Sequence, residues 1–83
     1  MTAVTIYSKP GCHLCDEMKA LVARVARTLP SPPEIREVDI TTDAGLEDRY
    51  GLEIPVLLVD GRKVAKYRIE EGALRRVLTT RHG

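Results

Sequence analysis

A short β-branched run at residues 4–7 opens the chain and ends at a breaker cluster, Ser8-Lys9-Pro10-Gly11. This pattern predicts a strand that is followed by a tight loop. From Cys12 onward, apolar residues recur with the period of an α-helix over about four turns. They are Leu14, Met18, Leu21, Val22, Val25 and Leu29. The proline-rich stretch at 30–33 predicts the end of this helix.

Residues 34–40 have mixed polarity and predict a second strand, of a kind that suits the edge of a sheet. Thr41, Thr42 and Asp43 follow, and side chains of these types cap the N-termini of helices. They predict a short helix through about Tyr50, with Gly51 in the C′ position.

The continuous apolar run Val-Leu-Leu-Val at 56–59 is typical of a strand that is buried on both faces. Asp60-Gly61 is a strong hairpin signal, so residues 62–67 are expected to form an exposed partner strand. Glu70 and Glu71 then open a final helix. Its expected apolar face consists of Ala73, Leu74, Val77 and Leu78.

The predicted order of elements is therefore β-α-β-α-β-β-α. A parallel βαβ unit followed by an antiparallel hairpin predicts an α/β protein with a four-stranded mixed sheet and helices on both faces. Because 83 residues suit one hydrophobic core and not two, we expect residues 1–83 to form one domain.

Composition and charge narrow the classes of function. Hydrophobic residues make up 43% of the chain and charged residues 30%, an ordinary globular balance. The net charge of +1 is too small for an electrostatic nucleic-acid binder. No apolar run approaches the roughly 20 residues that span a bilayer, and the first residues do not resemble a signal peptide. We expect a cytoplasmic monomer that binds neither nucleic acid nor membrane.

Charge is nevertheless uneven along the chain. Residues 34–53 carry two basic and seven acidic side chains, whereas residues 54–83 carry seven basic and three acidic ones. The two segments are either two solvated faces or a polarised surface that orients a partner protein.

The two cysteines, Cys12 and Cys15, lie where the first predicted strand hands over to the first predicted helix. A bridge between them closes so small a loop that it adds little stability, which argues for redox or metal chemistry. Backbone N–H groups at a helix N-terminus favour the thiolate of Cys12, so we expect its pKa to be depressed. Asp16 and Glu17 limit that depression. Cys15 lies within the first turn and supplies the resolving thiol that disulfide exchange requires.

Two cations accompany the pair. Lys9 lies three residues before Cys12 and is a candidate partner for its thiolate. His13 is a further candidate, although its side chain can equally point into solvent.

Other uses of the pair have less support. A structural zinc site needs four ligands, and the chain adds only His13 and His82 to its cysteines. Haem attachment needs a histidine directly after the second cysteine, where this chain has Asp16. An iron–sulfur or metal-binding carrier remains an alternative, as does a redox-inactive partner-binding module.

Ile54-Pro55 is the second informative element. A proline here can be an ordinary trans residue at the start of a strand. Beside a strand-loop-CxxC-helix unit, we expect a cis bond that exposes the backbone N–H and C=O of Ile54 toward a docked substrate strand.

Together these pieces resemble a glutaredoxin, of the thioredoxin-like superfamily. Residues 6–15 resemble the family's strand, Lys-x-x-Cys-x-x-Cys loop and helix, and residues 54–56 resemble its cis-proline segment. Asp60-Gly61 resembles the hairpin that follows. The resemblance spans almost the whole chain.

The resemblance implies a role for each of four residues. Cys12 would be the nucleophile and Cys15 the resolving thiol. Lys9 would contact the thiolate or a glutathione carboxylate, and Pro55 would be the proline of the substrate site.

The chain also departs from the glutaredoxin pattern. His13-Leu14 replaces the usual Pro-Tyr between the cysteines. Where the family has a Gly-Gly pair and then an Asp that hold the γ-glutamyl end of glutathione, this chain has Ala65-Lys66-Tyr67-Arg68. The side chains of Ala65 and Lys66 would crowd that groove, and Arg68 would repel the ammonium group of the ligand. We therefore expect a member of a small glutaredoxin-like subgroup that binds glutathione weakly.

The sequence thus predicts a dithiol–disulfide oxidoreductase with Cys12 and Cys15 as catalytic residues. No metal or organic cofactor is expected, and glutathione is a candidate co-substrate only. The expected partners are a disulfide-containing protein or a small-thiol substrate, together with a thiol reductant (a thioredoxin system or glutathione). The candidate substrate-binding residues are Lys9, His13, Leu14, Ile54 and Pro55.

Overall fold

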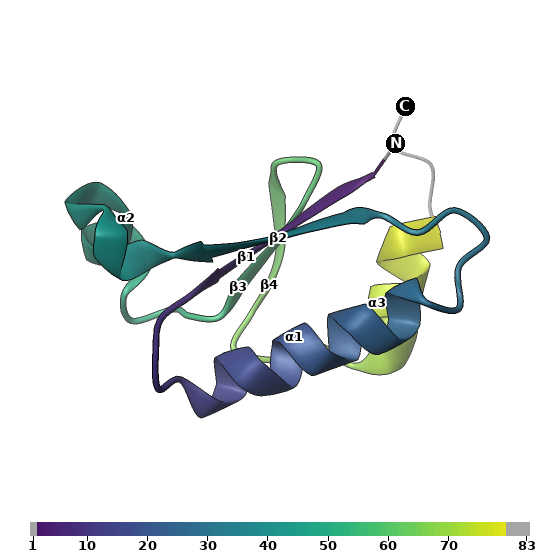
Figure 1. Cartoon of the computed structure of the whole chain (residues 1–83), viewed down its shortest axis with the longest axis horizontal. Coiled ribbons are helices and arrows are strands. Elements are labelled where there is room, and N and C mark those ends of the chain that lie inside the picture. The colour runs from purple at the N-terminus through teal and green to yellow at the C-terminus, as the bar shows by residue number, and fades with distance from the viewer. Residues whose placement is uncertain (1, 80–83) are drawn as a thin grey trace.

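Strand β1 (Ala3–Ser8) lies inside the sheet although it opens the chain. The computed structural model describes residues 2–79, and the strands within them have the order β2-β1-β3-β4 (Figure 1). β1 pairs in parallel with β2 (Glu34–Asp39) and antiparallel with β3 (Val56–Val59), which pairs antiparallel with β4 (Arg62–Lys66). The predicted four-stranded mixed sheet is confirmed, with β2 at an edge as expected.

The helices lie on both sides of this sheet. α1 (His13–Ala26) and α3 (Glu71–Thr79) pack together on one face, whereas α2 (Ala44–Tyr50) lies near the opposite end of the molecule (Figure 1). A 3-10 turn, η1 (Ile40–Thr42), leads from β2 into α2. The helices on both faces that the sequence predicted are confirmed.

Successive side chains of a strand point to opposite faces of the sheet, so alternate residues are buried on each face. Val4 and Ile6 of β1 pair with Val59 and Leu57 of β3, and all four are buried beneath α1 and α3. The core on this face also contains Met18, Val22, Val25, Leu74 and Leu78. Tyr7 points to the other face, where its ring lies 4.8 Å from that of Tyr50 in α2.

The hairpin between β3 and β4 forms as the Asp60-Gly61 pair predicts. Both residues have positive φ, 51° and 83°, the conformation that a two-residue turn of type I′ requires. Asp60 also ties the hairpin to the start of β1. Its N–H donates to the carbonyl of Ala3, and its carboxylate accepts from the Ala3 N–H at 2.9 Å.

Several element ends differ from the prediction; β2, for example, ends at Asp39 and not at Ile40, which begins η1. α1 ends at Ala26, before the predicted stop at the prolines, because Thr28 and Leu29 donate to the carbonyls of Val25 and Ala26 in tighter i→i+3 turns. β4 ends at Lys66 and not at residue 67, because Tyr67 adopts a left-handed backbone with φ +67°.

Two single positions also differ. Gly51 follows α2 with a right-handed φ of −54°, not as a left-handed C′ residue, because the chain continues into a turn in which Glu53 donates to the Tyr50 carbonyl. Ala73 is exposed, because the buried stripe of α3 runs through Leu74 and Leu78.

None of the helices within residues 2–79 combines the length and the apolarity that a membrane span needs. His82 lies outside the described residues.

The two leucines of β3 provide a test of this packing. Leu57 is fully buried in the core under α1 and α3, whereas Leu58 is half-buried on the opposite face. We expect Leu57→Ala to lower the free energy of unfolding by about 2–5 kcal/mol through lost burial and a residual cavity. Leu58→Ala is the matched control and should cost clearly less. Urea unfolding followed by circular dichroism measures both, and an equal or larger loss for Leu58→Ala would contradict this packing.

Candidate functional site

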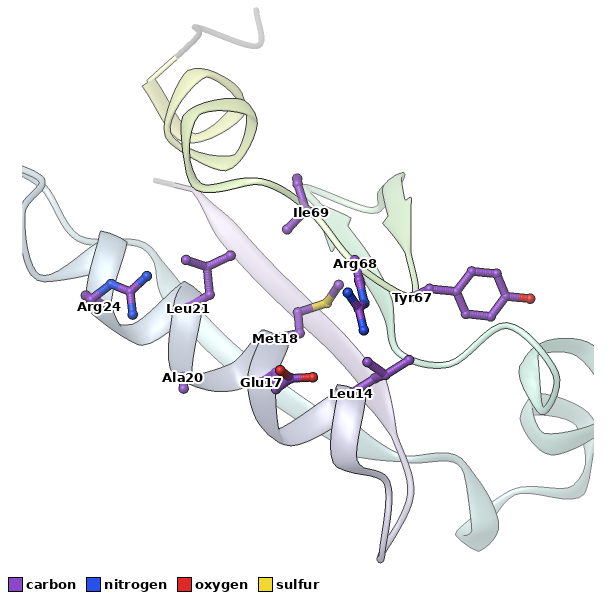
Figure 2. A pocket seen from close by; sticks show the side chains of 9 residues that line it. All are labelled: Leu14, Glu17, Met18, Ala20, Leu21, Arg24, Tyr67, Arg68 and Ile69. Carbon is purple, nitrogen blue, oxygen red and sulfur yellow. The ribbon is translucent and has the colours of Figure 1, made fainter.

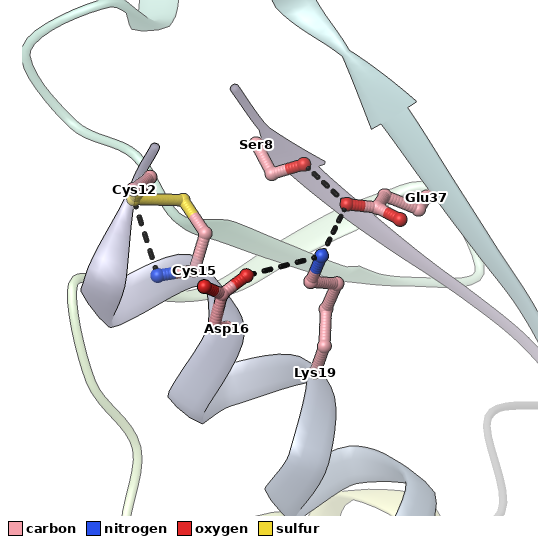
Figure 3. A network of polar contacts seen from close by, with 6 residues as sticks. All are labelled: Ser8, Cys12, Cys15, Asp16, Lys19 and Glu37. Atoms are coloured by element: carbon pink, nitrogen blue, oxygen red, sulfur yellow. Dashed lines mark hydrogen bonds and ion pairs between the residues drawn. A yellow bond between two sulfur atoms is a disulfide. The ribbon is translucent and has the colours of Figure 1, made fainter. Parts of the chain in front are cut away.

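The cysteine pair lies at the N-terminus of α1, as the sequence predicted. β1 ends at Ser8, and the loop reaches the helix through Gly11, whose φ of +77° favours glycine. Cys12 is the N-cap residue, with extended backbone, and its Sγ accepts a hydrogen bond of 3.1 Å from the N–H of Cys15 (Figure 3). The sulfur atom thus takes the place that a serine or aspartate oxygen usually takes at a cap.

Cys12 and Cys15 are joined by a disulfide, with their Cα atoms 5.2 Å apart (Figure 3). The two sulfurs have different surroundings. Cys15 is 1% exposed and packs with Ile40 and Ile54, whereas Cys12 lies at the partly exposed rim of the same cluster. Of the pair, Cys12 is therefore the sulfur that a macromolecular disulfide can approach.

A polar network runs from β1 to β2 beside the first turns of α1. Glu37 of β2 accepts from the buried Ser8 hydroxyl at 2.8 Å and from the Lys19 ammonium at 2.7 Å (Figure 3). Lys19 also forms an ion pair with Asp16 at 3.3 Å. The hydrogen bond from Lys19, and then that from Ser8, lower the pKa of Glu37, and the bond to Glu37 raises the pKa of Lys19.

This network changes how the acidic residues of α1 act on the site. Asp16 follows Cys15 directly, and an unbalanced carboxylate there would oppose a thiolate at Cys12. Lys19 balances Asp16, and it also ties α1 to the edge strand β2 through Glu37. Sequence reasoning missed Ser8, Lys19 and Glu37. Only the i,i+3 spacing of Asp16 and Lys19 signalled part of the network.

Neither of the two candidate cations, Lys9 and His13, forms a hydrogen bond with a cysteine sulfur in the described residues. Lys9 and His13 are both exposed. Within residues 2–79, neither side chain has a hydrogen bond or an ion pair. Lys9 lines a shallow hollow with Pro10, Asp16 and Glu37.

The Ile54–Pro55 bond is cis, as the sequence predicted. Ile54 is 8% exposed and contacts the cluster around Cys15, and Pro55 is fully buried. The prediction that both Ile54 polar groups face a docked strand is not tested. The carbonyl of Pro55 is already occupied, because it accepts from the N–H of Tyr67 at 2.8 Å.

A groove of about 410 Å³ lies between α1 and residues 67–69, and we refer to it as the α1 groove (Figure 2). Leu14, which stands between the two cysteines, belongs to its wall. The other lining residues are Glu17, Met18, Ala20, Leu21, Arg24, Tyr67, Arg68 and Ile69. Of the predicted substrate-binding residues, Leu14 is the one that lines the α1 groove.

Tyr67 stands at one end of this groove, and its ring points away from α1 (Figure 2). Its phenol donates to the carbonyl of Leu52 at 2.7 Å, and its left-handed backbone carries the chain from β4 toward α3. Leu52 itself is 93% exposed. Sequence reasoning treated Tyr67 only as part of the segment that replaces the Gly-Gly pair, because left-handed backbone at a tyrosine has no sequence signal.

We also searched the described part of the chain for side chains that could coordinate a metal ion. Within residues 2–79, no group of three or more His, Cys, Asp or Glu side chains is placed to hold an ion.

Comparisons with known proteins agree with this geometry. Residues 3–79 match the family described as "Glutaredoxin-like domain (DUF836)". A Dictyostelium discoideum protein named "Glutaredoxin-like protein YDR286C homolog" is 28% identical over 75 residues, which cover 86% of this chain and 69% of that protein.

Solved structures share the fold. The X-ray structure of protein XcR50 from X. campestris is 36% identical with a TM-score of 0.74, over 92% of this chain and 95% of that one. Fasciola hepatica thioredoxin is 21% identical with a TM-score of 0.64, over 94% of this chain and 78% of that one, and so shares the fold. With a thioredoxin-like fold and a cysteine pair at disulfide distance at the start of α1, the chain belongs to the glutaredoxin-like domain family.

Proposed function

We propose that the protein is a dithiol–disulfide oxidoreductase that uses Cys12 as the nucleophile and Cys15 as the resolving thiol. The observation that carries this proposal is the cap of α1, where the Cys12 sulfur accepts the Cys15 N–H. In the reduced protein the same N–H, together with the positive end of the helix dipole, stabilises a thiolate at Cys12.

The reaction has two steps, and two electrons pass to the substrate. The Cys12 thiolate first attacks a substrate disulfide, so that a bond forms between Cys12 and one substrate sulfur while the other leaves as a thiolate. Cys15 then loses its proton and attacks the Cys12 sulfur. This step releases the second substrate thiol and forms the Cys12–Cys15 disulfide, which an external thiol reductant must open before the next cycle.

The different burial of the two cysteines supports this assignment of roles. A substrate protein can reach the partly exposed Cys12, whereas Cys15 is buried beside Ile40 and Ile54. Cys15 is therefore within bonding distance of Cys12, while its burial shields it from external thiols. Ile54 belongs to the same cluster, and we propose that its backbone docks the substrate strand beside the mixed disulfide.

The roles of the cysteines can be tested by alkylation and by trapping. Because the helix terminus favours the Cys12 thiolate, iodoacetamide should alkylate Cys12 of the reduced protein at a pH well below that required by an ordinary thiol. Cys15→Ser should accumulate a mixed disulfide with substrate, and Cys12→Ser should abolish exchange. Peptide mapping after timed alkylation measures both rates, and faster alkylation of Cys15 would reverse the proposed roles.

Glutathione use is the finer part of the proposal, and we propose that glutathione is a poor ligand. Ala65 and Lys66 stand where the glutaredoxin resemblance expects a Gly-Gly pair, and Arg68 stands where it expects an acidic residue. Tyr67 adds bulk at the same place, held by its bond to Leu52. A lost charge-assisted contact costs about 1.5–3 kcal/mol, which weakens binding by about tenfold to a few hundredfold.

This proposal predicts that a dithiol reductant serves the protein better than glutathione does. The measurement compares the rate of reduction of a glutathionylated peptide with turnover supported by a thioredoxin system. We expect slow, non-saturating deglutathionylation and faster turnover with the dithiol system. Saturable deglutathionylation at micromolar concentrations of the glutathionylated peptide would show instead that other residues replace the missing motif.

A further inference from the structure

We propose that the α1 groove binds the segment of a protein substrate next to its reactive cysteine, and that it selects an apolar side chain followed by a carboxylate. This inference rests on the proposed function, since it names the substrate class that the Cys12–Cys15 site would accept.

Leu14 connects the groove to the reactive site. Leu14 lies between the two cysteines in the sequence and also lines the groove. A polypeptide bonded through its sulfur to Cys12 therefore has the groove beside it, along the first turns of α1. Tyr67, whose N–H is bonded to the Pro55 carbonyl, connects the far wall to the cis-proline segment.

The floor of the groove is apolar. Met18 is 3% exposed, and Leu21 and Ile69 are half-buried beside it (Figure 2). A groove of about 410 Å³ lies within the size range of small-molecule pockets. It has room for one or two large side chains. The floor thus suits a leucine-like or aromatic side chain.

The charges on the walls of the groove determine which substrate residue is preferred next to the apolar side chain. Arg24 is already paired with Glu71 of α3 at 2.9 Å. Arg68 has no ion pair within residues 2–79, and its guanidinium reaches over the groove between Met18 and Leu14 (Figure 2). Residues 62–68 carry four basic and no acidic side chains, so this side of the groove is positive. A carboxylate on the substrate complements it.

Glu17 stands on the opposite wall, also without an ion pair within the described residues. It disfavours a substrate whose acidic group lies on the α1 side and accepts a basic one there. Glu17 and Arg68 therefore act in opposite directions on an acidic substrate, which provides a test by charge reversal on each wall.

The wall that carries Arg68 is held in place. Tyr67 has a left-handed backbone that a tyrosine adopts only at a cost. Two hydrogen bonds compensate for it, from its N–H to Pro55 and from its phenol to Leu52. Arg68 is thus presented from a fixed turn.

The experiment uses the Cys15→Ser protein, which stops at the mixed disulfide, and two peptides whose single cysteine carries a thionitrobenzoate group. The peptides share a leucine beside the cysteine and differ only in an aspartate or a lysine at the next position. Attack by Cys12 breaks the peptide–thionitrobenzoate bond, forms the Cys12–peptide disulfide and releases coloured thionitrobenzoate. The second-order rate constant follows from its absorbance.

We expect the aspartate peptide to react about fivefold faster, which corresponds to about 1 kcal/mol. Arg68→Glu should remove or reverse this preference, and Glu17→Lys should enlarge it. Arg62→Glu is the matched control, because Arg62 lies on the exposed start of β4 and does not line the groove. It should leave the preference unchanged.

Equal rates for the two peptides, or equal effects of Arg68→Glu and Arg62→Glu, would overturn the groove assignment. The reaction of the Cys15→Ser protein with hydroxyethyl disulfide, which is small and neutral, separates this failure from failure of the proposed function. If that reaction proceeds while the peptide preference is absent, the groove inference alone is wrong. If Cys12 does not react with hydroxyethyl disulfide, both proposals are wrong.

Discussion

Burial of one side of α1 against β1 and β3 is the interaction on which the site depends. Val22 and Val25 of the helix pack on Ile6 and Leu57 of the central strands, and all four are excluded from water. Because β1 runs directly into the loop before α1, this packing fixes the N-terminus of the helix at the end of the strand. Cys12 therefore stands at a helix cap that the core holds in place, and not on a free loop.

The surroundings of the cysteine pair are arranged so that opposing charges are compensated locally. Asp16 favours the helix N-terminus but opposes a thiolate nearby, and Lys19 balances it. Glu37 joins the same ammonium to the buried Ser8 hydroxyl and so fastens the edge strand to the helix. The helix terminus keeps its attraction for an anion, while the carboxylate of Asp16 is paired with Lys19.

Local sequence pattern was enough to predict the strands, the helices, the hairpin and the cap at Cys12, because each follows from period, turn residues or spacing within a few positions. It was not enough for contacts that depend on which elements become neighbours. Ser8, Lys19 and Glu37 come from three different elements, and the pairing of β1 with β2 and the packing of α1 on the sheet bring them together. The left-handed Tyr67 was missed for a related reason, since its backbone is held by bonds to Pro55 and Leu52.

The central place of β1 also has a consequence for how the chain reaches its native state. Val4 pairs with Ile35 on one side and with Val59 on the other, so both partners of β1 lie far from it along the chain. Pairing between distant residues costs loop-closure entropy before any favourable contact forms, and this cost slows folding. On a nascent chain, the core between α1 and the sheet is therefore complete only after Leu57 and Val59 of β3 have been added.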